Sequence, residues 1–460
     1  MLESFLVSAF FLTAVVSIFV NQKVIEFRGS RFLDIPYYIS PFAAAFALVL
    51  TGVIDLNQVY TALTGISFSQ GLAFLNNSGP FSAILLFLSV AFVSLCLEVS
   101  GFFRYLAVKV LEKVDGSGRK LFFAVFWISG FLALFTSNDI LILTFTPFLI
   151  EFLRFTDLEA VPFLVAEFFA ANVFSMVFLI GNETNIIVAT SQGLGFLNFI
   201  EVMVIPGLAG GLACFISLYW VFRSRIPESY SCRELPDLKI DRWEVLSSSL
   251  LLGTLLSLAV FSVYGFLLWH IVLVWVLISL VLFVLPDTFE KVLQKKDAEE
   301  LFIYRINQKM PWEVVPFLIG FFVLVHASMV TGLTSGAQGL IEVLAGEDLL
   351  KTVFGVGVAS TLSANLLNNI PMTALFSEVL TGYGAGATRL GALYALVIGS
   401  NIGAIVTPIG ALAGIMWMKM VNHDGEKITF RGFFSIGWKI AIPTLLASLL
   451  GLYLSITFVL

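Results

Sequence analysis

Long apolar stretches, separated by short polar ones, dominate the chain. Runs of membrane-crossing length lie near residues 4–20, 37–54, 79–99, 200–222, 249–266, 267–285, 313–332 and 433–457. A helix needs about 20 apolar residues to cross the hydrocarbon core of a bilayer. Only helices and closed barrels satisfy all their backbone polar groups inside that core. The pattern therefore predicts an all-α polytopic membrane protein.

A second set of apolar runs is shorter or is interrupted by polar residues. These runs cover residues 120–136, 138–153, 162–180, 353–367, 370–381 and 391–418. Polar side chains inside a membrane are costly unless they line a cavity or find a partner. The interrupted runs and their ends hold all the polar motifs described next, which indicates a site built from broken helices.

The polar motifs occur twice, with matched spacing. Those of the first half are Ser137, Asn138, Asp139, Asn172, Gly181, Asn182, Glu183, Thr184 and Asn185. Those of the second half are Asn368, Asn369, Asn401, Thr407 and Gly410. Asn172 follows Asn138 by 34 residues and Asn401 follows Asn368 by 33, and a glycine comes nine residues later in both halves. Internally repeated broken helices are typical of secondary transporters with a site near the bilayer midplane.

The basic residues predict the orientation. The segments around 21–35, 100–120, 154, 222–248, 286–312 and 419–439 contain 23 of the 25 lysines and arginines, and only Lys351 and Arg389 fall on the other side. Basic loops favour the cytoplasm. Runs 120–136 and 138–153 then form a hairpin that enters from the cytoplasm, and 353–367 and 370–381 form one that enters from outside. This is an inverted-topology repeat.

We expect four parts along the chain. These are an N-terminal transmembrane helix and loop (1–36), a first transmembrane repeat (37–223), a cytoplasmic linker (224–248) and a second transmembrane repeat (249–460). The first apolar run follows Glu3 rather than a basic segment, which favours a spanning helix over a cleaved signal peptide. The predicted location is the cell (plasma) membrane, with multiple passes.

Composition narrows the class of protein. The chain is 59% hydrophobic and 12% charged, with a mean hydropathy of +0.98, which excludes an ordinary soluble domain. The three cysteines and three histidines lie far apart in sequence, so no metal or redox spacing is present. A membrane-embedded enzyme is therefore a remote alternative, and we expect no enzyme activity and no cofactor. The sequence contains no glycine-rich phosphate loop, which disfavours a primary pump. It also contains no pattern typical of nucleic-acid binding.

At these motifs the chain resembles the ArsB/NhaD permeases. This family belongs to the ion transporter superfamily, together with the divalent anion/sodium symporters and citrate transporters. The resemblance covers roughly residues 37–457 and is carried by the segments 166–172, 181–188, 138–139 with 146–147, 368–371 and 399–410. It implies two inverted repeats, each with a re-entrant hairpin and a discontinuous helix. It also implies a scaffold part, a moving part, elevator-like alternating access and a homodimer.

One position departs from the family pattern. Relatives often carry proline where this chain has Glu183, between Asn182 and Thr184. Asp139 and Glu183 are the acids expected at the site, and the motif segments contain no lysine or arginine to pair with them. A carboxylate in such a place binds a cation or a proton, so Na⁺ or H⁺ is the expected coupling ion.

We predict that the motif residues bind substrate and ion. Ser137, Asn138 and Asp139 would surround one site with Gly181 and Asn182. Its counterpart would be formed by Asn368, Asn369, Thr407 and Gly410. Na⁺ could bind at Asn138, Asp139, Asn182 and Asn369. The alternative interpretation is that these asparagines only cap broken helices. Glu167 is either a proton carrier or an interhelical hydrogen-bonding group, and both roles stay open.

The expected function is secondary active transport of a small anion or oxyanion, arsenite-like or carboxylate-like, coupled to an H⁺ or Na⁺ gradient. A Na⁺/H⁺ antiporter is the alternative, because no basic residue in the motifs could hold an anion. A passive channel is a further alternative, which saturable counterflow would separate from a carrier. The expected partners are a small-molecule or ion substrate and membrane lipid.

Overall fold

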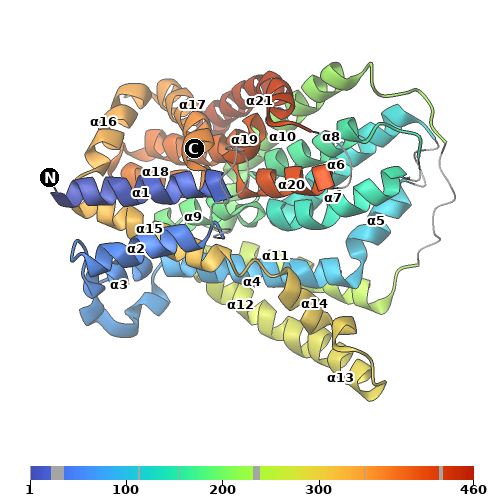
Figure 1. Ribbon diagram of the computed structural model, residues 1–460, viewed down its shortest axis with the longest axis horizontal. Helices are drawn as coiled ribbons and strands as arrows, with labels where there is room; N and C mark the ends of the chain where they lie inside the picture. The colour runs from blue at the N-terminus through green and yellow to red at the C-terminus, as the bar shows by residue number, and fades with distance from the viewer. Residues whose placement is uncertain are drawn as a thin grey trace, which may run out of the picture.

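The protein is almost entirely helical. The computed structural model describes residues 2–21, 36–111, 114, 116–154, 156–231, 239–346, 348–423 and 428–459, and no strand occurs among them. Nine helical segments within these ranges are long and apolar enough to cross a membrane. Figure 1 shows many of the long helices running side by side along the long axis of the molecule. The predicted all-α polytopic class is confirmed.

The first half breaks its helices where the polar motifs predicted. One break separates α6 from α7 at residues 136–137, and a second separates α8 from α9 at 175–182. Its helices are α1 (Leu2–Asn21), α2 (Ile39–Leu50), α3 (Leu56–Thr64), α4 (Pro80–Ser100), α5 (Phe102–Leu111), α6 (Gly118–Phe135), α7 (Asn138–Arg154), α8 (Ala160–Phe174), α9 (Glu183–Gln192) and α10 (Phe196–Phe222).

The second half contains the matching breaks. Asn368 separates α17 from α18, and residues 407–411 separate α19 from α20. Its helices are α11 (Arg242–Val263), α12 (Leu268–Ser279), α13 (Leu285–Leu293), α14 (Phe302–Lys309), α15 (Val314–Val330), α16 (Thr334–Ala345), α17 (Leu349–Leu367), α18 (Asn369–Val379), α19 (Gly386–Val406), α20 (Leu412–His423) and α21 (Phe430–Val459).

The two halves exchange contacts in a reciprocal way. The second arm of the first hairpin, α7, packs against α20, which follows the break of the second half. The second arm of the other hairpin, α18, packs against α9, which follows the break of the first half. In Figure 1, α6, α7 and α8 lie on the right and α16, α17 and α18 on the left. Halves related by a two-fold axis would pack in this way, and the inverted-topology repeat itself stays a prediction.

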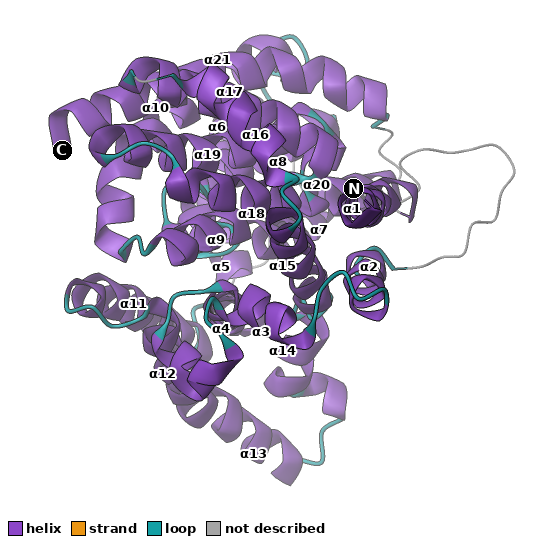
Figure 2. Cartoon of the chain, turned by 90° about the vertical axis from the view of Figure 1, so that its left-hand side faces the viewer, coloured by secondary structure: helices purple, strands orange, loops and turns teal. Residues whose placement is uncertain are grey.

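Helices α11 and α12 form a separate layer. Both pack mainly on α4 and on each other, and α11 also contacts α10; Figure 2 shows them with α13 well apart from α17 and α21. Less than half of their apolar spans is buried in the protein. Large apolar side chains such as Leu252, Leu256 and Val281 are exposed there, as expected for a surface that faces lipid.

Two polar segments contain more helix than the sequence pattern predicted. Helix α11 begins at Arg242, inside the predicted linker 224–248, and Asp241 caps it by accepting a hydrogen bond from the Arg242 N–H. The predicted loop 286–312 holds α13 and α14. Short amphipathic helices rich in charge do not give an apolar run of membrane-crossing length, so the pattern could not separate them from loops.

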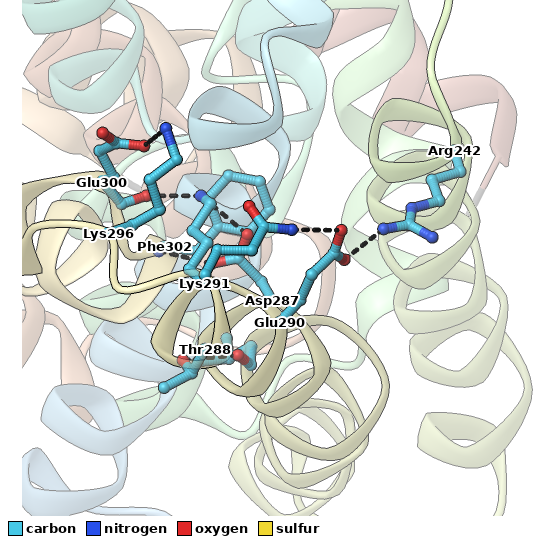
Figure 3. A network of polar contacts seen from close by, with 10 residues as sticks. Arg242, Asp287, Thr288, Glu290, Lys291, Lys296, Glu300 and Phe302 are labelled. Carbon is cyan, nitrogen blue, oxygen red and sulfur yellow. Dashed lines mark hydrogen bonds and ion pairs between the residues drawn. The ribbon is translucent and has the colours of Figure 1, made fainter.

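Charged contacts make the corner between α13 and α14 rigid (Figure 3). The buried Asp287 carboxylate lies 2.8 Å from Lys291 Nζ and accepts a 2.9 Å hydrogen bond from the Phe302 N–H. Lys291 Nζ also lies 4.2 Å from the centre of the Phe302 ring. Arg242 joins this corner to α11 through Glu290 at 2.5 Å. A buried carboxylate that is paired and hydrogen-bonded fixes the local geometry.

Candidate functional site

The N-termini of α7, α9 and α20, which follow three of the helix breaks, meet at one cavity of about 320 Å³, here called the Asp139 cavity. The N-terminus of α15 also lies on its wall, together with Tyr37, which precedes α2, and residues of α4. The lining residues used below are Asp139, Glu183, Lys309, Val314, Leu412 and Met416. Each helix N-terminus carries a partial positive charge of about half a unit, so the broken helices create a polarised space inside an apolar protein.

Three carboxylates line this polarised space, those of Asp139, Glu183 and Glu313. Glu183 is buried and its Oε1 accepts a 3.0 Å hydrogen bond from Ser137 Oγ, whereas Asp139 and Glu313 are half-buried. Within the described residues none of the three pairs with a lysine or arginine, because Lys309 on the cavity wall pairs with Glu98 at 2.5 Å. When ionised, these carboxylates outweigh the partial positive charges of the helix ends. The net charge of the cavity therefore depends on whether they hold protons or a cation.

The tip of the first hairpin is joined to the broken helix behind it. Asn138 Nδ2 donates a 3.1 Å hydrogen bond to Asn172 Oδ1, and Asn172 Nδ2 donates to the Phe168 carbonyl at 2.8 Å. The other polar atom of the Asn138 side chain, Oδ1, is buried and has no hydrogen-bond partner. Most buried polar atoms in proteins are paired, so this oxygen is available for a ligand.

Asn401 of the second half is the centre of a network in the first half. Its Oδ1 accepts 2.9 Å hydrogen bonds from Ser175 Oγ and Asn182 Nδ2, and its Nδ2 donates to Asn185 Oδ1 at 2.9 Å. Ser400 Oγ donates to Thr184 Oγ1 at 3.0 Å. The Asn401 amide thus fills the gap opened by the α8–α9 break, and its binding role stays a prediction.

The second hairpin tip uses a strained backbone. Asn368 has φ +71° and ψ 151°, a conformation nearly restricted to glycine and found at functional sites. Its Nδ2 donates to the Ile409 carbonyl at 3.3 Å. Asn369 Oδ1 is buried without a partner. Thr407 Oγ1 donates to Asn365 Oδ1 at 2.5 Å.

Asn365 is a residue that the sequence analysis missed. Its Nδ2 donates to the Gly403 carbonyl at 3.1 Å, so it joins α17 to α19 as well as to Thr407. The available signal was its position one helical turn before Asn369. Ser175 and Ser400 were also missed as binding candidates, because isolated hydroxyls in apolar runs usually bond to their own helix.

Gly181 and Gly410 have the same role in the two halves. A Cβ on Gly181 would lie 2.3 Å from the Ser175 carbonyl oxygen, and a Cβ on Gly410 would lie 2.4 Å from the Gly403 carbonyl oxygen. Both glycines lie in the short 3₁₀ turn that follows the broken helix. The matched spacing in the sequence thus corresponds to a matched backbone fold-back that no other residue could adopt without movement.

Comparison with known proteins identifies the family. A sequence profile described as "Arsenical pump membrane protein" matches residues 13–456. The chain belongs to the arsenical pump membrane protein family. It is 28% identical to the arsenical pump membrane protein of Escherichia coli over 392 residues, which cover 82% of this chain and 87% of the relative. It is 27% identical to the Yersinia enterocolitica protein of the same name over 449 residues, which cover 96% and 99%.

More distant relatives cover similar lengths. The chain is 26% identical to a 46 kDa membrane protein of Mycobacterium leprae over 437 residues, which cover 90% of this chain and 97% of the relative. The resemblance stated from the motifs is confirmed by these matches. The chain is a multi-pass protein of the cell membrane, and the arsenical pump membrane protein family is one of membrane transport proteins.

The residues predicted to bind Na⁺ have fewer free oxygen atoms than the sequence suggested. Asn182 Oδ1 caps α9 by accepting 3.0 Å hydrogen bonds from the N–H and the Oγ1 of Thr184. Asn182 is therefore engaged as a cap, in agreement with the alternative interpretation. Asn138 and Asn369 each keep a free oxygen, and Asp139 faces the cavity. Within the described ranges no group of three His, Cys, Asp or Glu residues could hold a metal ion.

Glu167 lies behind the cavity wall rather than on it. Its fully buried carboxylate accepts hydrogen bonds from Thr146 Oγ1 at 3.1 Å and from Trp417 Nε1 at 3.2 Å. These bonds join α7, α8 and α20. Of the two roles left open for Glu167, the contacts support the interhelical hydrogen-bonding one.

Proposed function

We propose that the protein is a secondary active transporter that moves a small oxyanion, arsenite-like or carboxylate-like, coupled to an H⁺ or Na⁺ gradient. The observation that carries the proposal is the carboxylate pair of Asp139 and Glu183 at three helix N-termini. Helix N-termini favour an anion, and unpaired carboxylates disfavour one until they are neutralised. Binding of a proton or cation therefore changes which solute the cavity accepts, and this linkage is what coupling requires.

The free asparagine oxygens support a cation at the site. Asn138 Oδ1 and Asn369 Oδ1 are buried without partners, and each unsatisfied buried acceptor costs about 1–3 kcal/mol. A Na⁺ ion or a donated proton would remove that cost. Each oxygen lies at a hairpin tip, so occupancy there would also stabilise one arrangement of the hairpins.

The way in which the halves are joined supports a proposal of alternating access. The Asn401 network holds α8, α9 and α19 together as one body, while α11 and α12 pack on α4 in a separate layer. In this proposal the broken helices of repeats 37–223 and 249–460 move together against that layer, in an elevator-like way. The homodimer implied by the resemblance would then form on the layer that does not move.

A Na⁺/H⁺ antiporter is the second candidate. The observation in its favour is that Lys309, the one lysine that the described residues place on the wall of the Asp139 cavity, already pairs with Glu98. An anion would then be held by helix ends alone. In the antiporter, Asp139 and Glu183 would exchange Na⁺ for H⁺ without any solute.

The test uses purified protein in proteoliposomes with a pH gradient or a Na⁺ gradient imposed separately. Arsenite, dicarboxylates, citrate, sulfate and no solute are compared under each gradient. Gradient-driven movement of one oxyanion supports the proposal. Na⁺-dependent proton movement without any solute supports the antiporter instead. Flux that does not saturate and shows no counterflow would indicate a channel and contradict both.

A further inference from the structure

A second cavity, here called the His326 cavity, lies at the other ends of the same helices. Its volume is about 360 Å³, and its wall includes Asn77, Thr190, Ser191, His326, Ser377 and Glu378. Helix α9 begins at the Asp139 cavity with Glu183 and reaches the His326 cavity with Thr190 and Ser191. Helix α15 does the same with Val314 and His326. The two cavities are thus separated along α9 by about 10 Å.

One face of α18 carries polar residues from the hairpin tip toward the His326 cavity. Asn369, Thr373 and Ser377 follow one another at four-residue spacing, which places them on one side of the helix. Ser377 lines the His326 cavity, as does Thr381 in the 3₁₀ turn that follows α18. Asn369, Thr373 and Ser377 are 3%, 0% and 1% exposed. The polar row therefore runs from this cavity to the tip of the second hairpin, and it is closed to bulk solvent.

Thr373 differs from other buried threonines of the protein. Its hydroxyl has no hydrogen-bond partner. By contrast, Thr190 and Thr254 donate to carbonyls four residues earlier in their own helices, at 2.6 and 2.8 Å. Asn369 Oδ1, one turn further in, is also unpaired. The Thr373 hydroxyl and the Asn369 amide oxygen are thus neighbouring buried groups that each keep a free acceptor position on one face of one helix. Such a pair indicates a position that a cation or a donated proton occupies at some stage.

Hydroxyls and charged groups surround the outer end of the row. Ser377 Oγ lies 2.6 Å from Ser191 Oγ. Glu378 and His326 are the titratable groups on the cavity wall. Arg389 Nη2 donates to Gln192 Oε1 at 2.9 Å, and Gln192 Nε2 donates to the Ser377 carbonyl and to Thr381 Oγ1 at 3.1 Å, so Gln192 lies between the guanidinium and the polar row. The Glu378 carboxylate therefore favours positive charge at the entrance.

We propose that a monovalent cation, either a proton or Na⁺, reaches the Asn369 end of the transport site from the His326 cavity along this face of α18, with Thr373 as the intermediate ligand. The inference rests on the proposed function, because it supplies the route of its coupling ion. The route serves the cation alone, since the complete burial of Thr373 leaves no space for a solute. The basic loops place the His326 cavity on the external side.

The first experiment separates coupling from solute exchange. Thr373→Val removes the hydroxyl at constant size, Thr373→Ser keeps it, and Thr254→Val is the matched control in α11. In proteoliposomes we expect Thr373→Val to slow gradient-driven transport by about tenfold, the usual size of a lost hydrogen bond to a charged group. Solute–solute exchange should stay within about twofold, and Thr373→Ser should retain coupling. Unchanged coupling in Thr373→Val, or an equal fall of both processes, would overturn the inference.

The second experiment measures access directly. Thr373→Cys and the control Thr254→Cys are placed in a chain whose Cys96, Cys214 and Cys232 are replaced by serine. External Ag⁺, a monovalent cation, should inhibit the Thr373→Cys protein, whereas a bulky cationic thiol reagent should not. Inhibition only from the internal side, or equal inhibition of both variants, would refute the route.

The two proposals fail in different ways. A parent chain that transports solute, with Thr373→Cys insensitive to external Ag⁺, refutes the route and leaves the transporter intact. A parent chain that moves neither solute nor cation under either gradient refutes both.

Discussion

The side-chain amide of Asn401 joins the two halves of the protein. The break between α8 and α9 leaves Asn182 and Asn185 in need of partners, and Asn401 of α19 supplies them. It can do so because α19 lies against α8. The packing of the two halves therefore decides this pairing.

We predict that Asn401→Ala destabilises the protein by several kcal/mol. The substitution leaves Asn182 Nδ2 and Asn185 Oδ1 buried without partners, at about 1–3 kcal/mol for each group. Thermal unfolding in detergent would show a clearly lower midpoint. The control is Asn198→Ala, because the Asn198 side chain is exposed and should tolerate the change. Equal midpoints for the two variants would contradict the role of Asn401.

The breaks are the elements that the sequence predicted best. Matched glycines and asparagines inside apolar runs indicated four interruptions, and the structure has them after Phe135, Phe174, Leu367 and Val406. Elements with mixed charge were missed. Helix α13 carries Asp287, Glu290 and Lys291, so its pattern resembles a solvated loop, and its contacts with α14 and α11 appear only in three dimensions.

Alanine at Gly181 or Gly410 should prevent the fold-back at its break. The added Cβ would lie 2.3 or 2.4 Å from a backbone oxygen, a distance that forces the helix ends apart. We expect each variant to lose transport by about tenfold or more, because misplacing binding groups by about 1 Å can cost a hundredfold. Gly336→Ala is the control, since nothing lies within 4 Å of a Cβ there. Normal initial rates of solute transport in Gly181→Ala would contradict the assignment.

A pH-dependent contact connects the start of α8 to the end of α10. Arg225 Nε donates to Glu159 Oε2 at 2.8 Å, outside the membrane-spanning helices. This hydrogen bond holds the pKa of Glu159 below its ordinary value. A carboxylate with a lowered pKa stabilises the folded state fully above its unfolded pKa, about 4.3. The stabilisation is lost as the pH falls through the lower, folded value.

The wild-type chain should therefore be more stable than Glu159→Gln at pH 7, by no more than about 1 kcal/mol because both side chains are partly exposed. The difference should begin to shrink as the pH falls below the unfolded value of about 4.3 and should keep shrinking toward the lower, folded value. Unfolding midpoints of the two proteins in detergent, measured from pH 7 to pH 3.5, would check this. A difference that grows on acidification would show that the sign is wrong.

At the scale of the whole molecule, the reciprocal packing of α7 with α20 and of α9 with α18 joins the broken helices of the two halves. Charge placement alone predicted two hairpins of opposite sense, and the structure contains both hairpins. The family profile matches residues 13–456, so the similarity includes both halves of the chain. Sequence could not reveal the Asp139 cavity or the His326 cavity, because each is assembled from residues hundreds of positions apart.

The central claim is that Asp139 and Glu183 couple cation binding to solute transport. The most direct test measures solute flux and cation flux together in proteoliposomes, for the wild-type chain and for Asp139→Asn combined with Glu183→Gln. We expect solute and cation fluxes to rise and fall together in the wild type. In the double variant, transport should no longer respond to the gradient, while solute binding persists. If the double variant still accumulates solute with the wild-type ratio of solute flux to cation flux, these two carboxylates do not couple transport.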